Sequence, residues 1–393
     1  MEQVITPPKS PKKSLTGTTP KDKTVEVKNR EAAFWVALSC VPLLGAVRLK
    51  KLIEVFHSAE ETWKTKDDLI EKLNFPNSVK QSLLENRRKI DPESELQKVE
   101  SGGFKIITYQ DQEYPKLLSE IHDPPVMLYL YGQISALRGT LFAVVGTRKV
   151  TSYGERVADY FVSQLVFRGL TIVSGMARGI DSLVHSQTLE NQGKTVAVLG
   201  SGLDIIYPPE NRKLAERIIE KGALISEYPL GTPPLRQNFP VRNRLISGLS
   251  VGLLVVEAAE KSGTLITVQQ ALAQNRKVFA VPGSIFNPLS KGTLKLIKSG
   301  AKPVETIDDI MDELNLGQHI TDQKKPAFIE IVCQSNEEKL ICKALVENEA
   351  LSIDEIKRKT GLSMALVNSI LTKMEIRGTV INSGGAVYAL KKS

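Results

Sequence analysis

The sequence predicts an α/β protein built on a parallel β-sheet, with a smaller helical domain before it and a winged helix after it. Three observations predict this. Between residues 141 and 281, six short apolar runs rich in β-branched residues alternate with Gly-rich turns and segments of helical length, the pattern of βαβ units. Both flanks show helical periodicity instead. The 393 residues, 41% of them hydrophobic, suffice for two or three domains.

Residues 1–29 are predicted to form a disordered basic tail, because prolines alternate with lysines and almost nothing is available to bury. The formal net charge of the whole chain is +8, which favours an anionic partner without choosing between nucleic acid and a membrane surface. The tail either adds weak, salt-sensitive attraction to nucleic acid or is solvated and has no role in binding.

The composition also sets expectations about location and cofactors. The three cysteines, Cys40, Cys333 and Cys342, suggest neither a zinc site nor a disulfide framework, and free thiols fit a reducing cytoplasm. No secretory signal is visible, and no apolar run approaches the roughly 20 residues that span a bilayer. We therefore expect a cytoplasmic protein with no membrane contact, no metal and no cofactor.

Residues 30–100 are predicted to form a helical domain that resembles a helix–hairpin–helix. Apolar residues fall at helical spacing on both sides of residues 42–45, Pro-Leu-Leu-Gly. A Gly-containing turn between two helices can offer backbone N–H groups to a phosphate. The second glycine of such turns is replaced here by Leu44 or Val47, so simple helical packing is the alternative.

Residues 101–314 are predicted to form a Rossmann-like domain with helices on both faces of the sheet. Each expected strand is a short run rich in β-branched side chains, and the segments between the runs are long enough for helices. The six runs are Leu141–Val145, Leu170–Val173, Thr195–Leu199, Ala223–Ile225, Val251–Val256 and Lys277–Val281.

Three short loops of small residues follow strands of this domain and open helices. Loops after parallel strands meet at one edge of the sheet, where glycine allows close approach and helix N-termini favour anions. We expect a phosphate-binding edge, with purely structural turns as the alternative. The candidate DNA-binding residues in these loops are Gly146, Thr147, Arg148, Lys149, Ser174, Gly175, Arg178, Ser262, Gly263 and Thr264.

The densest positive cluster is the segment Arg236-Gln-Asn-Phe-Pro-Val-Arg-Asn-Arg244. Its candidate DNA-binding residues are Arg236, Phe239, Arg242 and Arg244. Guanidinium groups pair with phosphates, and an aromatic ring offers a stacking face to any base, which is what a single-strand groove requires. The alternative places Phe239 in the core and pairs the arginines with Glu227 and Glu257.

Catalytic patterns are weak in this sequence. Asp181 and His185 lie four residues apart, but a nucleophile–base pair would need a partner such as Ser174, and fixing of the loop by hydrogen bonds is the alternative. The run Gly200-Ser-Gly202 starts like a dinucleotide fingerprint, yet Ile205 stands at its third glycine position. We therefore predict no catalytic residue and no NAD.

Residues 315–336 are predicted to be a polar linker and residues 337–393 a winged helix, from three helical segments followed by a hairpin with a Gly-Gly turn. Lys373 is the one positive charge in the third helix, at about residues 363–376, whereas a duplex-reading helix carries several polar side chains toward the groove. Contact with protein or weak contact with duplex DNA is as consistent with this helix as sequence reading.

The motifs, in their order, resemble the DprA/Smf family of DNA-processing proteins. The resemblance covers residues 109–304 closely and both ends loosely. It rests above all on two specific strings, Ser-Gly-Met-Ala-Arg-Gly-Ile-Asp at 174–181 and Phe-Pro-Val-Arg-Asn-Arg at 239–244. Shorter matches include Gly146-Thr-Arg148, Tyr207-Pro208, Ser226-Glu227 and Pro282-Gly283. One departure is Leu294, which stands where the family has Asn after Gly-Thr.

The resemblance implies an extended Rossmann-like fold, an N-terminal SAM or helix–hairpin–helix-like domain and a C-terminal winged helix. It also implies a homodimer formed through the central domain, and cooperative binding of single-stranded DNA with weaker binding of duplex. The implied role is to protect incoming DNA in natural transformation and to load the RecA recombinase onto strands coated by single-strand-binding protein. By position, Arg148 looks like the arginine of the family's pocket motif, and Arg236 and Phe239 look like its phosphate-gripping and base-stacking pair.

Two other functions compete with this one. A LOG-like phosphoribohydrolase shares the fold, but Thr267 stands where the catalytic glutamate of that loop would be. A winged-helix transcription factor would use the central domain as a ligand sensor. Base release from AMP would reveal the first, and loss of DNA binding on removal of the winged helix would reveal the second.

Overall fold

The computed structural model describes residues 20–316, 335–348, 350–382 and 385–390, with side chains described from residue 30 except at residues 346 and 347. The chain divides into two compact units, residues 1–318 and 319–393, and each is described by itself. Helix α1 begins at Pro20, within the expected tail, and the rest of that tail lies outside the described residues. Most of the predicted linker lies outside them too. None of the described helices has both the length and the apolar character needed to cross a membrane.

The first part of unit 1 is helical, as predicted. Trp35, Leu52 and Leu83 are buried in its core, and Trp35 meets Tyr109 of the neighbouring domain edge-on, with ring centroids 6.0 Å apart. In the turn before the second helix, Leu43 has the left-handed φ of 66° that glycine adopts most easily. Its helices are α1 Pro20–Ser39, α2 Gly45–Phe56, α3 Ala59–Lys64, α4 Asp67–Glu71, α5 Asn77–Arg87 and α6 Pro92–Ser101.

A nine-stranded sheet with the order β1-β2-β6-β5-β4-β3-β7-β8-β9 forms the centre of unit 1. The seven strands from β6 to β9 are mutually parallel, and β2 runs antiparallel to β6 and to β1. All six predicted strands are present. The strands are β1 Lys105–Thr108, β2 Met127–Gly132, β3 Leu141–Val145, β4 Thr171–Ser174, β5 Thr195–Val198, β6 Ala223–Ser226, β7 Gly252–Val255, β8 Lys277–Ala280 and β9 Lys302–Pro303.

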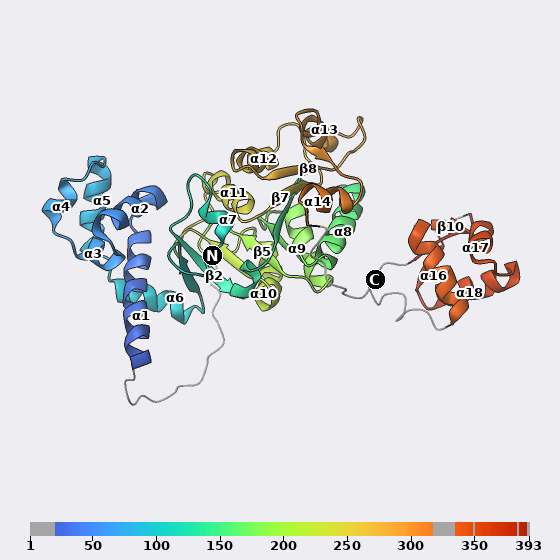
Figure 1. The fold of residues 1–393 in the computed structure, drawn as a ribbon, viewed down its shortest axis with the longest axis horizontal. Coiled ribbons are helices and arrows are strands. Elements are labelled where there is room, and N and C mark those ends of the chain that lie inside the picture. The colour runs from blue at the N-terminus through green and yellow to red at the C-terminus, as the bar shows by residue number, and fades with distance from the viewer. Residues whose placement is uncertain (1–19, 317–334, 349, 383–384, 391–393) are drawn as a thin grey trace. The chain divides into compact units, whose positions relative to one another are not determined.

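Helices cover both faces of this sheet (Figure 1). The side chains of β3 alternate between the two faces, so that Val144 belongs to the core with Phe161 of α8 and Val145 to the core with Leu245 of α11. Every β3 residue is buried, as expected for a parallel strand covered on both sides. The helices are α7 Lys116–Ser119, α8 Ser152–Phe167, α9 Ile180–Glu190, α10 Arg212–Lys221, α11 Asn238–Gly248, α12 Thr264–Ala273, α13 Lys291–Lys298 and α14 Asp308–Glu313.

Unit 2 contains three helices and a small sheet. Its core includes Ile341, Ile356, Leu371 and Met374, which come from all three helices. The predicted hairpin is β11–β12, and a third short strand, β10, pairs with β12 to give the order β10-β12-β11. The elements are α16 Asn336–Asn348, β10 Ala350–Ser352, α17 Ile353–Thr360, α18 Met364–Ile376, β11 Val380–Asn382 and β12 Val387–Leu390.

Candidate nucleic-acid interface

The three predicted loops meet on one edge of the sheet. They follow β4, β3 and β7, which are neighbouring parallel strands, so their carboxyl ends point the same way. The chain adds β4, β5 and β6 on one side of β3 and then returns to place β7 on its other side. Such a switch point opens a crevice beyond the carboxyl ends of the strands. We call this edge, formed by the loops after β3 to β8, the carboxyl rim.

Backbone hydrogen bonds connect the loops of the carboxyl rim to one another. The Thr147 N–H donates to the Glu257 carbonyl at 2.8 Å, and the Ile180 N–H donates to the Thr147 carbonyl at 3.1 Å. The Thr264 hydroxyl donates to the Gly146 carbonyl at 2.9 Å. The rim is therefore a fixed surface, and the Thr264 hydroxyl is used in building it.

The rim glycines have different roles. A Cβ at Gly175 would lie 2.8 Å from both the Arg242 guanidinium and the Asp181 carboxylate, and a Cβ at Gly179 would meet the backbone of Thr147. These two glycines are required by packing inside the protein. Gly263 is exposed and has open space around its Cβ position, so it is a glycine that a ligand can approach.

Four basic side chains of the predicted site are exposed: Arg148, Lys149, Arg178 and Arg236. Arg178 forms an ion pair with Glu210, whose hydrogen bond raises the pKa of the guanidinium. Within the described part of the chain, Arg148, Lys149 and Arg236 take part in no ion pair. These three cations are therefore available to an external anion.

The structure corrects the prediction for Arg242. Its side chain is buried, and Nη1 donates to the carbonyls of Gly175, at 2.7 Å, and Val198. Burial lowers the pKa of Arg242 to about 10, an effect that the nearby Asp181 carboxylate opposes. Because Gly175 directly follows β4 and Val198 ends the neighbouring β5, Arg242 joins the loops of the rim from inside.

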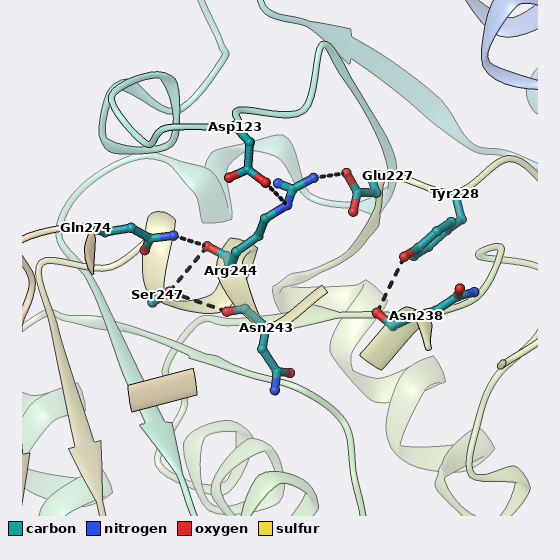
Figure 2. Close-up of polar contacts among 8 residues, drawn as sticks. All are labelled: Asp123, Glu227, Tyr228, Asn238, Asn243, Arg244, Ser247 and Gln274. Atoms are coloured by element: carbon teal, nitrogen blue, oxygen red, sulfur yellow. Dashed lines mark hydrogen bonds and ion pairs between the residues drawn. The ribbon is translucent and has the colours of Figure 1, made fainter. Parts of the chain in front are cut away.

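The prediction for Arg244 is corrected in the same way (Figure 2). Its guanidinium is buried, forms an ion pair with Glu227, and places Nε 3.1 Å from the Asp123 carboxylate. The side-chain amide of Gln274, the residue directly after α12, donates to the Arg244 carbonyl at 3.0 Å. Arg244 therefore fixes α11 against the loop after β6. The pairing with Glu227 is the alternative that the sequence left open.

Glu257 pairs with neither arginine. It is buried at the end of β7, where its carboxylate accepts from the Thr151 hydroxyl at 2.6 Å and from the Thr151 N–H at 3.2 Å. The Thr151 hydroxyl in turn accepts from the Gly154 N–H and caps α8. Sequence reasoning missed this role, although a carboxylate directly after a buried parallel strand points to a structural contact at the rim.

Phe239 is half-buried and lies beside a second aromatic ring. Its centroid is 5.7 Å from that of Tyr207, and the rings are tilted by 44°. A Cβ at Gly200 would lie 3.1 Å from the Phe239 ring, so this glycine lets the ring lie on the loop after β5. Tyr207 is 42% exposed and was not among the predicted site residues. Together with Arg236, the two rings form an aromatic and basic surface on the carboxyl rim.

The remaining polar candidates serve the fold. The Ser174 hydroxyl is buried and donates to the Val144 carbonyl at 2.7 Å, so in this structure it faces the interior and not the surface of the rim. The Ser262 hydroxyl donates to that of Thr264 at 3.0 Å. His185 is buried 2.7 Å from the Thr195 hydroxyl, and burial, with Arg242 nearby, lowers its pKa to about 3.

Ser174 and His185 do not form a nucleophile–base pair with each other, because the Ser174 hydroxyl contacts the Val144 carbonyl and His185 contacts Thr195. The described residues contain no group of three side chains able to hold a metal ion. Thr267, at the position of the glutamate in phosphoribohydrolases, is buried. The arrangement can bind an anion and stack a planar group.

Two family models match this chain. The model of DNA recombination-mediator protein A matches residues 105–315, and the model of the DprA winged helix domain matches residues 334–386. The chain belongs to the DprA/Smf family. The predicted fold is confirmed with it, since the α/β domain and the winged helix are both those of this DNA-processing family.

Relatives in the DprA/Smf family cover most of the chain. Protein Smf of Synechocystis is 35% identical over 393 residues, which cover 92% of this chain and 99% of that protein. DprA of Bacillus subtilis is 44% identical over 213 residues, which cover 54% and 72%.

Two solved structures resemble the described fold. DprA from Streptococcus pneumoniae has a TM-score of 0.65 at 36% identity, over 72% of this chain and 97% of that chain. DNA processing protein A from Helicobacter pylori has a TM-score of 0.50 at 29% identity, over 55% and 98%, and its structure is described as giving insight into a single-stranded DNA binding mode.

Proposed function

We propose that this protein binds single-stranded DNA along the carboxyl rim. One observation carries the proposal: exposed, unpaired Arg148, Lys149 and Arg236 share this rim with the Phe239–Tyr207 aromatic pair. Guanidinium and ammonium groups attract phosphates of any sequence, and aromatic faces accept any base. The single-stranded DNA binding described for the Helicobacter pylori relative supports the same ligand.

The DNA-contacting groups in this proposal differ from those expected from sequence. Arg148, Lys149 and Arg236 bind phosphates, and one base stacks on Phe239 with Tyr207 beside it. The backbones of Gly146, Thr147 and Gly263 lie behind the phosphates, and Arg178 contributes when it exchanges Glu210 for a phosphate. Arg242, Arg244, Ser174 and Thr264 act indirectly, by holding the loops in place.

We infer the role of the protein in the cell from its membership of the DprA/Smf family. The protein protects incoming single strands during natural transformation, acts as a homodimer in the cytoplasm, and loads the RecA recombinase onto strands coated by single-strand-binding protein. Duplex DNA binds more weakly, since paired bases present no free face to Phe239. Binding involves no bond cleavage, because the Ser174 hydroxyl and His185 are committed to contacts inside the fold.

Arg148→Ala tests the site. It removes one exposed cation with no ion pair in the described structure, so thermal stability is expected to remain close to wild type. Affinity for oligo-dT falls, and the slope of log affinity against log salt becomes shallower by about 0.7, the value for one phosphate contact on a single strand. Filter binding at several salt concentrations, with oligo-dT and the matching duplex, measures both. Unchanged affinity and slope would overturn the proposed site.

A further inference from the structure

The turn after β8 presents two large apolar side chains to solvent. Phe286 is 87% exposed, more than any other large hydrophobic residue described, and Ile285 is 70% exposed. Hydrogen bonds close the turn: the Asn287 N–H donates to the Ser284 carbonyl at 3.0 Å, and the Phe286 N–H donates to the Ser284 hydroxyl at 3.3 Å. An ordered turn that holds adjacent apolar groups in water is typical of a binding surface.

This turn belongs to the carboxyl rim. β8 is parallel to β7, so the loop after it emerges on the same edge as Arg148. The Tyr153 hydroxyl, in the first turn of α8, donates to the Pro282 carbonyl at 2.7 Å. The Ala258 N–H donates to the Leu289 carbonyl at 2.8 Å. Hydrogen bonds therefore connect the loops after β3, β7 and β8, which carry Arg148 and Phe286.

The charge around the turn is positive. Lys149 follows β3, Lys261 follows β7 and Lys291 begins α13; all three are exposed, and none forms an ion pair within the described residues. The nearby carboxylate of Glu260 lies 3.8 Å from the Lys295 ammonium. Exposed aromatic and apolar groups surrounded by free cations suit a polyanion that carries flat apolar bases, which distinguishes this patch from a purely apolar protein contact.

We propose that Phe286 and Ile285 form a second base-stacking platform, which extends the single-strand path from Arg148 across the ends of β7 and β8. This rests on the proposed function. Phe239 lies against the loop after β5, and β5 is four strands from β8 in the sheet. At about 4.8 Å per strand, the two strands are about 19 Å apart. The shortest oligonucleotides therefore reach one platform, and longer ones reach both.

Phe286→Ala tests this with an oligo-dT series from about 4 to about 16 nucleotides. The variant is expected to match wild type on the shortest strands and to bind the longest at least about fivefold more weakly, the effect of losing one stacked base. Phe286→Tyr keeps the ring and is expected to restore binding. The matched control is Leu272→Ala, which removes a 58% exposed side chain near the far end of α12.

A fluorescence measurement reports the contact directly. The two native tryptophans, Trp35 and Trp63, are buried in the helical domain, so Phe286→Trp adds one exposed indole to a constant background. Long oligo-dT is expected to quench its emission, because a base stacks on it. Phe239→Ala, made in the same background, should leave that quenching in place at saturating DNA.

The outcomes separate the platform from the proposed function. Equal affinity of Phe286→Ala and wild type at every length, with Arg148→Ala weakened, overturns the platform and keeps the site at Arg148. If Phe286→Ala binds DNA more weakly and Arg148→Ala binds like wild type, the platform is kept and the proposed site at Arg148 is overturned. If Phe286→Ala changes the sedimentation of the free protein and leaves DNA affinity unchanged, the turn is a contact between copies of the chain, and the platform is again overturned.

Discussion

An arginine at the carboxyl rim either faces solvent or is enclosed by the protein, and this decides what its charge can do. Arg148 is exposed and retains a charge for an external anion. Arg242 is buried and donates hydrogen bonds to the carbonyls of Gly175 and Val198, so these donors are used inside the molecule. Composition cannot distinguish the two, since both occur in loops or helix starts rich in polar residues. What distinguishes them is the position of each side chain relative to the sheet.

His185 illustrates the same effect for a group that titrates. Its ring is fully enclosed, Nδ1 lies 2.7 Å from the Thr195 hydroxyl, and no hydrogen-bond partner for Nε2 is found within the described structure. Burial favours the neutral ring and, with the Arg242 charge, lowers its pKa to about 3 from the ordinary value of 6.5. In the unfolded chain His185 is therefore protonated as the pH falls through about 6.5, whereas in the folded protein it stays neutral until about pH 3.

Stability should consequently fall as the pH is lowered from about 6.5 toward about 3. Between pH 7.5 and 5.5 this one group lowers the free energy of unfolding by about 1.4 kcal/mol. Urea unfolding of wild type and His185→Gln at both pH values measures it, because the other titrating groups cancel in the comparison. An equal pH dependence in the two proteins would show that His185 becomes protonated in the fold.

At the scale of elements, α11 links the aromatic surface to the body of the domain. It begins at Asn238, carries Phe239 in its first turn, and buries Arg242 and Arg244 in the turns that follow. The sequence analysis placed Arg236, Phe239, Arg242 and Arg244 together as candidate DNA-binding residues, with pairing of the arginines to Glu227 and Glu257 as the alternative. Phe239 and Arg242 lie three residues apart on one side of α11, and the Arg242 guanidinium lies 5.8 Å from the centroid of the Phe239 ring. The ring is half-buried at the rim, whereas both arginine side chains are buried.

Removing Arg244 should therefore damage both stability and binding. Burial raises the pKa of Glu227, and the charge of Arg244 opposes that rise. Arg244→Ala therefore leaves a buried carboxylate without the cation that pairs with it. We expect a loss of about 3–5 kcal/mol in the free energy of unfolding, typical of a broken buried ion pair. The loss is larger at pH 8 than at pH 5, because protonation relieves the stranded carboxylate.

The control for that experiment is the exposed pair of Lys277, which begins β8, and Glu313, which ends α14, 2.6 Å apart. Lys277→Ala should leave both the unfolding curve and DNA affinity nearly unchanged, since water screens an exposed pair. Urea unfolding and oligo-dT titration of both variants provide the comparison. If Arg244→Ala were as stable as Lys277→Ala, the buried pair would not be what holds α11.

Sequence patterns captured the elements that repeat and missed those that do not. Six of the seven parallel strands were visible because each is a buried β-branched run between helical segments, whereas β9 has two residues. β2, Met127–Gly132, is followed by the short 3-10 helix Ile134–Leu137 and not by an α-helix, and it pairs antiparallel with β6, so it has no βαβ rhythm to reveal it. β10 has three residues, too few for alternation to be seen. The rim loops were found because strand order and glycine spacing are local, whereas the contacts of Arg244 with Asp123 and Glu227 are not.

At the scale of the whole molecule, the chain consists of two units with separate cores. The exposed cations and aromatic rings of the carboxyl rim all belong to unit 1, which contains the complete nine-stranded sheet. In unit 2, the third helix of the winged helix, α18, has Lys373 as its one basic side chain, and its buried residues Val367, Ile370, Leu371 and Met374 face the core of that unit. Little of this helix is therefore suited to a DNA groove.

Deletion of residues 319–393 should leave single-strand binding largely intact. The shortened chain keeps every proposed DNA contact, so its oligo-dT affinity and salt slope are expected to match the full chain, apart from a small uniform loss from Lys357, Arg358 and Lys359 of α17. Filter binding of both proteins, each checked for cooperative urea unfolding, measures this. A collapse of single-strand affinity in a folded shortened chain would move the DNA-binding surface to the winged helix and favour the transcription-factor alternative, because the rim alone would then be insufficient to hold a strand.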